Sequence, residues 1–173
     1  HRDLLVLQRR LGDPRAVPGC GSSLRSVKID TQLTGELGTI GAEARRLRYL
    51  GFDGAFSFEG PRDLFPPLVE AALAGGGTGD AYAGLDLYPN VAISFPRSPM
   101  HLAYTAWDLQ RLTGGHFALG LGTQVKPHIE RRYSATWDRP VPRMREQVLA
   151  IKAIFACWQQ GQKLDFRGDF YTH

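Results

Sequence analysis

The chain has 173 residues, of which 43% are hydrophobic, 10% aromatic and 22% charged, the proportions of an ordinary globular protein with one core. No apolar run approaches the ~20 residues of a membrane-spanning helix, so we expect a soluble protein with no membrane partner. The formal net charge is +4, yet residues 1–26 hold five Arg and two Asp, which leaves the rest nearly neutral and gives no reason to expect a nucleic-acid partner.

Cysteine and histidine usage excludes two further classes of protein. Cys20 and Cys157 are too few for a disulfide framework or a thiolate metal cage, which favours a reducing cytoplasm. No pair of histidines has metal-ligand spacing with a carboxylate beside it, so we predict no metal.

The first 26 residues differ from the remainder of the chain. They combine an apolar run too short for a targeting signal with a cluster of Pro, Gly and Ser that breaks regular structure. We expect residues 1–26 to be a disordered or non-native leader and residues 27–173 to form the domain.

From residue 27 onward, strand patterns alternate with helix patterns. Short β-type runs are expected at residues 27–33, 54–58, 85–93 and 116–122. Helical patterns are expected at residues 40–50, 63–73, 98–112 and from Pro142 through at least Phe155. The tail, residues 164–171, has the pattern of a small hairpin that turns at Gly168.

Individual residues sharpen these boundaries. Thr39 is expected to cap the first helix, and Ser98-Pro99 is a strong start signal for the third. Pro89 cannot donate a hydrogen bond to a strand neighbour, so the third strand should bulge or end there. Residues 75–84 are rich in glycine but lack Gly-Lys-Ser/Thr, and a mobile surface loop is expected rather than a phosphate-binding loop.

Strands that alternate with helices predict a parallel sheet covered by helices, the α/β class. Periodicity alone leaves two architectures open, an open doubly wound sheet or the first half of an eight-fold barrel. A whole barrel usually needs ~250 residues, and only residues 27–173 follow the leader.

The second half of the chain resembles a known family. Arg97 opens the sequence RSP, residues 102–109 read LAYTAWDL, residues 112–123 read LTGGHFALGLGT and residues 166–171 read FRGDFY. This combination is similar to the luciferase-like monooxygenase family, barrel enzymes that use FMN or the deazaflavin coenzyme F-420. The resemblance implies a (β/α)8 TIM-barrel type fold, truncated to about its first four βα units, and the loop at residues 122–133 resembles the F-420-dependent subgroup.

In such a barrel the chemistry lies at the carboxyl ends of the strands. The resemblance therefore places cofactor contacts at Thr31, Gly120, Gly122 and Thr123, because glycines let a planar ring approach closely. Relatives that bind the deazaflavin often have a non-proline cis peptide bulge in the third strand, which would fall at Asn90-Val91 and would make these two residues further cofactor contacts that support the ring. A plain strand end at that position, and glycines that only permit helix packing, are the alternatives.

Two residues are candidates for catalysis. Glu59 stands where many relatives have an Asp-His pair, and it would orient a substrate or exchange a proton with it. His128 lies in the polar loop after the fourth strand. A solvated carboxylate at Glu59 and a surface charge cluster around His128 are the alternatives.

Three functions follow. The first is hydride transfer between reduced coenzyme F-420 and a small organic substrate. The second is FMN-dependent monooxygenation. The third is a non-catalytic half-barrel, whose exposed edges would in any case favour a homo-oligomer.

Overall fold

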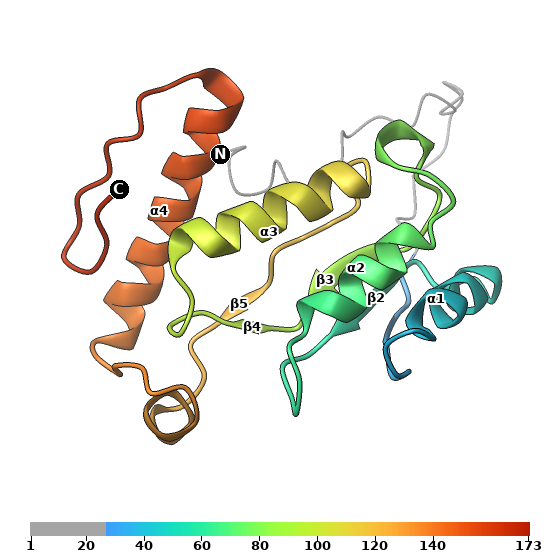
Figure 1. Ribbon diagram of the computed structural model, residues 1–173, viewed down its shortest axis with the longest axis horizontal. Helices are drawn as coiled ribbons and strands as arrows, with labels where there is room; N and C mark the ends of the chain where they lie inside the picture. The colour runs from blue at the N-terminus through green and yellow to red at the C-terminus, as the bar shows by residue number, and fades with distance from the viewer. Residues whose placement is uncertain (1–26) are drawn as a thin grey trace.

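The computed structural model describes residues 27–173, and the prediction for residues 1–26 lies outside them. The elements shown in Figure 1 are β1 (Asp30–Gln32), α1 (Ile40–Tyr49), β2 (Gly54–Ser57), α2 (Phe65–Leu73), η2 (Gly79–Ala81), β3 (Asp86–Pro89), β4 (Ala92–Ile93), α3 (Pro99–Leu112), β5 (Leu121–Gly122), η3 (His128–Arg132) and α4 (Pro140–Gln160).

The strands are parallel and neighbour one another in chain order. β1, β2 and β3 form one sheet, and β4 pairs with β5. A parallel bridge between Leu87 and Phe117 continues the series from β3 toward β5. The predicted α/β class is confirmed, and the arrangement is that of the first βα units of a (β/α)8 barrel.

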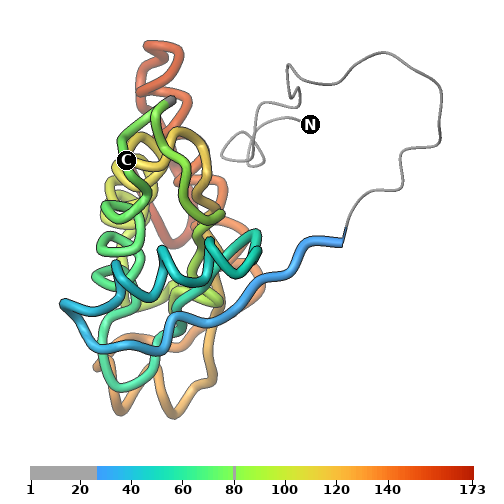
Figure 2. The backbone as a smooth tube through the Cα atoms, turned by 90° about the vertical axis from the view of Figure 1, so that its right-hand side faces the viewer, coloured from blue at the N-terminus to red at the C-terminus, as the bar shows by residue number. Residues whose placement is uncertain are grey.

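Two predicted strands are longer than the observed ones. β1 has only three residues in its ladder and pairs with β2 alone, and Figure 2 shows the blue segment that leads into it entering from one side. The fourth strand is reduced to β5 and the Phe117 bridge. It is short because its neighbour is interrupted between β3 and β4, where Pro89 predicts a break.

Register assigns the residues of each strand to two faces. Ala55 lies between Thr31 and Leu87, and both Ala55 and Leu87 are buried in the core beneath the helices. Phe56 and Tyr88 occupy the opposite face, with ring centroids 5.7 Å apart. This second face corresponds to the interior of a barrel.

The helix starts follow local chemistry. Ser98 caps α3, because its hydroxyl accepts a hydrogen bond from the His101 N–H at 3.2 Å, as predicted. Thr39 does not cap α1: its hydroxyl donates to the Glu36 carbonyl at 2.7 Å instead. α4 begins at Pro140, two residues before the predicted start at Pro142.

α3 and α4 pack through aromatic side chains. The Trp107 ring lies 6.1 Å from Phe155 and 5.3 Å from Trp158 in a T-shaped contact. Both tryptophans pack against the main core. No helix within residues 27–173 is long and apolar enough to cross a membrane.

The tail forms the predicted small hairpin. Arg167 and Thr172 make an antiparallel bridge, and the Gly168 N–H donates to the Tyr171 carbonyl at 3.0 Å. The Glu146 carboxylate on α4 accepts backbone hydrogen bonds from residues 169–171. These bonds fix the hairpin against α4.

Candidate functional site

The carboxyl ends of β2, β3 and β5 meet around the break in the third strand. Asn90 and Val91 form this break, and the peptide bond between them is cis, at the position that the resemblance implies. The Asn90 N–H donates to the Ser57 carbonyl at 2.8 Å, which joins the break to the end of β2. Both side chains are exposed, so the break presents its surface at the edge where barrel enzymes bind their ligands.

The glycines of the fourth strand allow that strand to pack closely beside the third one. A side chain on Gly120 would overlap the Pro89 carbonyl oxygen, and one on Gly122 would overlap the Val91 side chain. The chain therefore needs glycine at these positions in order to pack beside its own third strand. Contact between these glycines and a cofactor remains a prediction, but Val91 occupies the space that Gly122 leaves.

Glu59 is held by four hydrogen bonds. Its carboxylate accepts from the Ile93 N–H at 2.9 Å, from both terminal nitrogens of Arg97 at 2.7 and 2.8 Å, and from the Tyr133 hydroxyl at 3.1 Å. Only 5% of its side chain is exposed. Both carboxylate oxygens already accept hydrogen bonds from the protein, which favours a role for Glu59 in positioning its neighbours. The catalytic role is an untested prediction.

The Glu59 charge shapes the ionisation of its neighbours. Burial alone would lower the pKa of Arg97, but the hydrogen bonds and charges of Glu59 and Asp63 outweigh burial and raise it. The pKa of Tyr133 is also raised, first by burial and then by the Glu59 charge. Arg97 therefore stays a cation and Tyr133 stays a neutral donor, which keeps the cluster intact near neutral pH.

α4 braces this cluster from behind. The fully buried Gln147 amide donates to the carbonyls of Ser94 at 3.1 Å and of Arg97 at 2.9 Å. Arg143 lies over the Phe95 ring with its guanidinium carbon 4.6 Å from the centroid. This support from α4 was not predicted from the sequence. Its signal is a polar residue in an apolar helical stripe, because Gln147 follows Met144 by three positions and precedes Ile151 by four.

The remaining predicted site residues lie apart from this cluster. Thr31 is in β1, two strands away from the break, and its register with Ala55 places it on the face covered by helices. The Thr123 hydroxyl donates to the neighbouring Gln124 carbonyl at 3.1 Å. His128 is exposed at the start of η3 and makes no side-chain hydrogen bond within residues 27–173. Roles for these three residues in binding or catalysis stay predictions.

η3 and the residue that follows it contact the segment just after β2. The Arg132 guanidinium donates to the Gly60 carbonyl, and the Tyr133 hydroxyl donates to Glu59. Ile129 is buried in a small second core with Ile93 and Phe95. The segment after the fourth strand is thereby placed beside the candidate site.

Comparison with known proteins assigns this chain to a family. The family model for luciferase-like monooxygenases matches residues 22–173. The chain belongs to this family. The resemblance seen in the sequence motifs is confirmed, and enzymes of this family are oxidoreductases.

Sequence relatives cover most of this chain but only part of their own length. An uncharacterized protein of Mycobacterium tuberculosis is 43% identical over 149 residues, which are 86% of this chain and 42% of that protein. The 5,10-methylenetetrahydromethanopterin reductase of Archaeoglobus fulgidus is 29% identical over 87 residues, 50% of this chain and 25% of that enzyme. The chain thus spans less than half the length of the curated relatives it matches.

A solved structure shows the same fold. The oxygenating constituent of 3,6-diketocamphane monooxygenase from Pseudomonas putida, in complex with FMN, superposes with a TM-score of 0.66 at 12% identity. The match covers 86% of this chain and 44% of that one. At this identity the likeness supports the fold alone.

Proposed function

We propose that this chain contributes the amino-terminal half of a flavin- or deazaflavin-binding barrel that transfers hydride between reduced coenzyme F-420 and a small organic substrate. Family membership supports an oxidoreductase. The relationship to a reductase and the resemblance of residues 122–133 to the F-420-dependent subgroup favour hydride transfer. The free Cys157 thiol in α4 is consistent with a reducing cytoplasm, where we place this reaction.

The observation that carries the proposal is the exposed break at Asn90 and Val91, set at the carboxyl ends of the strands. The proposal places a planar ring at this edge, against the Val91 side chain, which is 39% exposed and fills the space beside Gly122. The bound coenzyme would supply two-electron redox chemistry. The protein would supply the surface that holds the ring.

The residues behind the break would fix its position. Glu59 holds the Ile93 N–H, and Arg97 spans both oxygens of Glu59. Gln147 then holds the Arg97 carbonyl from α4. Preorganised edges of this kind reduce the loss of entropy on binding and keep a substrate in line with the ring.

FMN-dependent monooxygenation is the second candidate function. It is favoured by one observation, that the structurally similar monooxygenase of Pseudomonas putida is in complex with FMN. The same edge would hold either ring, so the cofactor distinguishes the two functions.

Titration of the purified full chain with coenzyme F-420 and with FMN tests the proposal, with absorbance and fluorescence as readouts. Micromolar binding of F-420 in preference to FMN supports hydride transfer. Preference for FMN overturns it in favour of the second candidate. Binding of neither contradicts both and favours a non-catalytic half-barrel that self-associates.

A matched pair of variants locates the binding edge. Val91→Asp places a charge at the break, whereas Val69→Asp places one on the outer side of α2 at nearly the same exposure, 38% against 39%. We expect Val91→Asp to weaken cofactor binding at least tenfold and Val69→Asp to leave it unchanged. Equal affinities for the two variants contradict the placement of the ring.

A further inference from the structure

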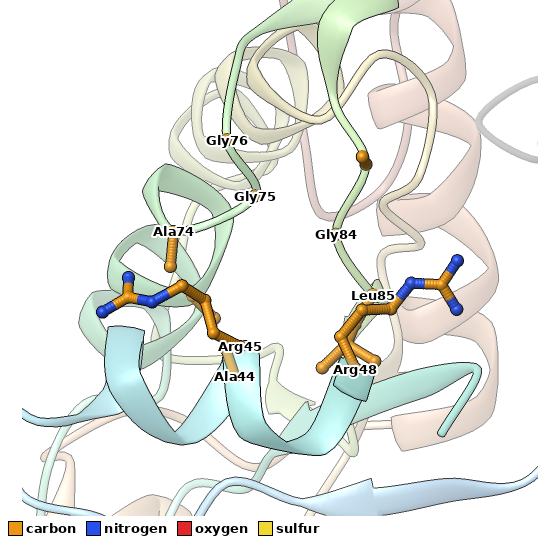
Figure 3. A pocket seen from close by; sticks show the side chains of 10 residues that line it. Ala44, Arg45, Arg48, Ala74, Gly75, Gly76, Gly84 and Leu85 are labelled. Carbon is orange, nitrogen blue, oxygen red and sulfur yellow. The ribbon is translucent and has the colours of Figure 1, made fainter. Parts of the chain in front are cut away.

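A groove of about 160 Å³ lies on the outer side of the fold, between α1, the end of α2 and the chain that leads into β3 (Figure 3). Leu85, one of its lining residues, directly precedes β3. The groove is therefore at the amino end of the strand, and the candidate site at Asn90 and Val91 is at the carboxyl end. The proposed function makes no use of it.

The walls of the groove are apolar and small. Alanine and leucine side chains line it together with three glycines: Ala44, Ala71, Ala74, Ala83, Leu85, Gly75, Gly76 and Gly84. Its size corresponds to roughly five water-sized groups, enough for a short alkyl chain.

A buried tyrosine holds the glycine-rich wall in place. Side chains on Gly75 or Gly84 would overlap Tyr82, whose hydroxyl donates to the Leu85 carbonyl at 2.7 Å. The Ala83 N–H also donates to the Gly75 carbonyl at 3.1 Å. The glycine-rich segment at residues 75–84 is therefore held in place by these hydrogen bonds. It forms one side of a defined groove.

Both ionisable side chains that line the groove are cationic. Arg45 and Arg48 lie on α1 at its rim, and Figure 3 shows their guanidinium groups on opposite sides of the opening. Neither makes a hydrogen bond or ion pair with another residue of the described part of the chain. Arg62 and Arg97, by contrast, are paired with carboxylates.

The nearby carboxylate on α2 is hydrogen-bonded to backbone groups and not to the rim arginines. Glu70 accepts hydrogen bonds from the N–H groups of Gly38 at 2.8 Å and Gly41 at 3.0 Å, and these bonds lower its pKa. Glu70 therefore stays an anion that is hydrogen-bonded to the start of α1, and within residues 27–173 it forms no ion pair with Arg45 or Arg48. The rim keeps two positive charges above an apolar floor.

We propose that this groove binds a small organic anion, a short-chain carboxylate of about four to six carbons. The carboxylate would lie at the mouth, where a guanidinium can donate two parallel hydrogen bonds to it. The alkyl chain would cover the alanine side chains and remove apolar surface from water. Charge at one end and apolar surface at the other distinguish this ligand from inorganic phosphate and from a neutral alcohol.

Nuclear magnetic resonance titration of the full chain tests the proposal. The probes are pentanoate, pentanol, which has the chain without the charge, and inorganic phosphate, which has charge without the chain. We expect pentanoate to shift the amide signals of Gly75, Gly76 and Gly84 saturably in the millimolar range, and the other two probes to bind at least fivefold more weakly. Equal binding of pentanol, or shifts scattered over the surface, would overturn the proposal.

Arginine variants on one helix face supply the matched control. Arg45→Gln and Arg48→Gln should each weaken pentanoate binding at least threefold, and the double variant should abolish it. Arg46→Gln removes the same charge from an exposed position outside the groove and should leave binding unchanged. An equal loss in Arg46→Gln contradicts the site. Because all three arginines are exposed on α1, thermal unfolding should show that each variant still folds. The cofactor titration at the other end of the strands is independent of this result.

Discussion

Glu59 and Arg97 form a two-pronged ion pair in which each carboxylate oxygen accepts from a different guanidinium nitrogen, at 2.7 and 2.8 Å. The pair joins the end of β2 to the residue that precedes the Ser98 cap of α3. Asp63 adds a third contact to Arg97 at 3.1 Å. The geometry is that of a bidentate ion pair that holds two loops together at the candidate site.

Loss of the Glu59 charge should destabilise the chain. Glu59→Gln leaves the largely buried Arg97 without its main counter-charge, and we expect the free energy of unfolding to fall by about 1–3 kcal/mol, since Arg97 keeps some solvent contact and its bond to Asp63. Urea unfolding measures this change. Glu36→Gln, which breaks the exposed pair with Arg62, is the control and should leave stability unchanged. Equal effects of the two substitutions would show that the Glu59 pair is as weak as a surface pair.

The buried amide of Gln147 should contribute comparably. Gln147→Leu keeps the apolar packing of α4 but leaves the Arg97 carbonyl without its donor, whereas the Ser94 carbonyl keeps the hydrogen bond from the Arg97 N–H at 2.9 Å. We expect a loss of about 1–3 kcal/mol in urea unfolding, because an unpaired carbonyl away from water is costly. Gln160→Leu at the exposed end of the same helix is the control. A Gln147→Leu variant of unchanged stability would mean that water replaces the amide.

The parts of the fold that sequence predicted best are those fixed by local chemistry. The Ser98 cap, the break after Pro89 and the hairpin at Gly168 each depend on properties of one or two residues, and all three are present. The boundaries of β1 and β5 were predicted less well. A strand ends where its neighbour stops offering hydrogen bonds, and that depends on residues far away in sequence.

The candidate site likewise has one part that could be predicted from the sequence and one that could not. The location of the cis bulge at Asn90-Val91 was implied by the family resemblance and is confirmed. The partners of Glu59 could not be predicted, because Arg97 and Tyr133 follow it by 38 and 74 positions. Such contacts depend on how the βα units pack. The residue pattern of a single segment does not predict these contacts.

Substitutions at the two glycines of the fourth strand test whether each position is crowded by backbone atoms or by a side chain. Gly120→Ala and Gly122→Ala should each lower the free energy of unfolding by about 1–3 kcal/mol, since both introduce overlaps. Val91→Ala should restore much of the stability of Gly122→Ala, because that overlap is with the Val91 side chain. It should not rescue Gly120→Ala, whose overlap is with the Pro89 carbonyl. Rescue of both variants, or of neither, would contradict this packing.

The free energy of unfolding should fall at high pH because of the ionisation of Tyr88. Burial, followed by its hydrogen bond to Asp30 and the charge of that carboxylate, raises the pKa of Tyr88 to about 12 from the ordinary 10.0. The folded chain therefore keeps this proton where the unfolded chain has lost it. The stabilisation is complete below about pH 10 and is lost as pH rises toward 12.

The absorbance of tyrosinate against pH measures this ionisation. Tyr88→Phe should remove a transition near pH 12, and Asp30→Asn should move that transition to lower pH because the negative charge is gone. Tyr49→Phe is the control, since Tyr49 is 91% exposed. If the Asp30→Asn curve matches that of the unsubstituted chain, the carboxylate is not responsible for the shift.

Self-association through the free edge of β1 is the last prediction. Within residues 27–173, β1 pairs with β2 alone, and Ile29 beside it is 58% exposed. In this part of the chain the edge therefore offers backbone groups and apolar surface to a second copy. We expect sedimentation to show a dimer whose fraction rises with concentration. Ile29→Lys should reduce that fraction several-fold, because a charged edge resists strand pairing. Val141→Lys, at a position of α4 that is 77% exposed, should leave it unchanged. A chain that stays monomeric at every concentration, or an equal effect of both lysines, would exclude the β1 edge as the interface.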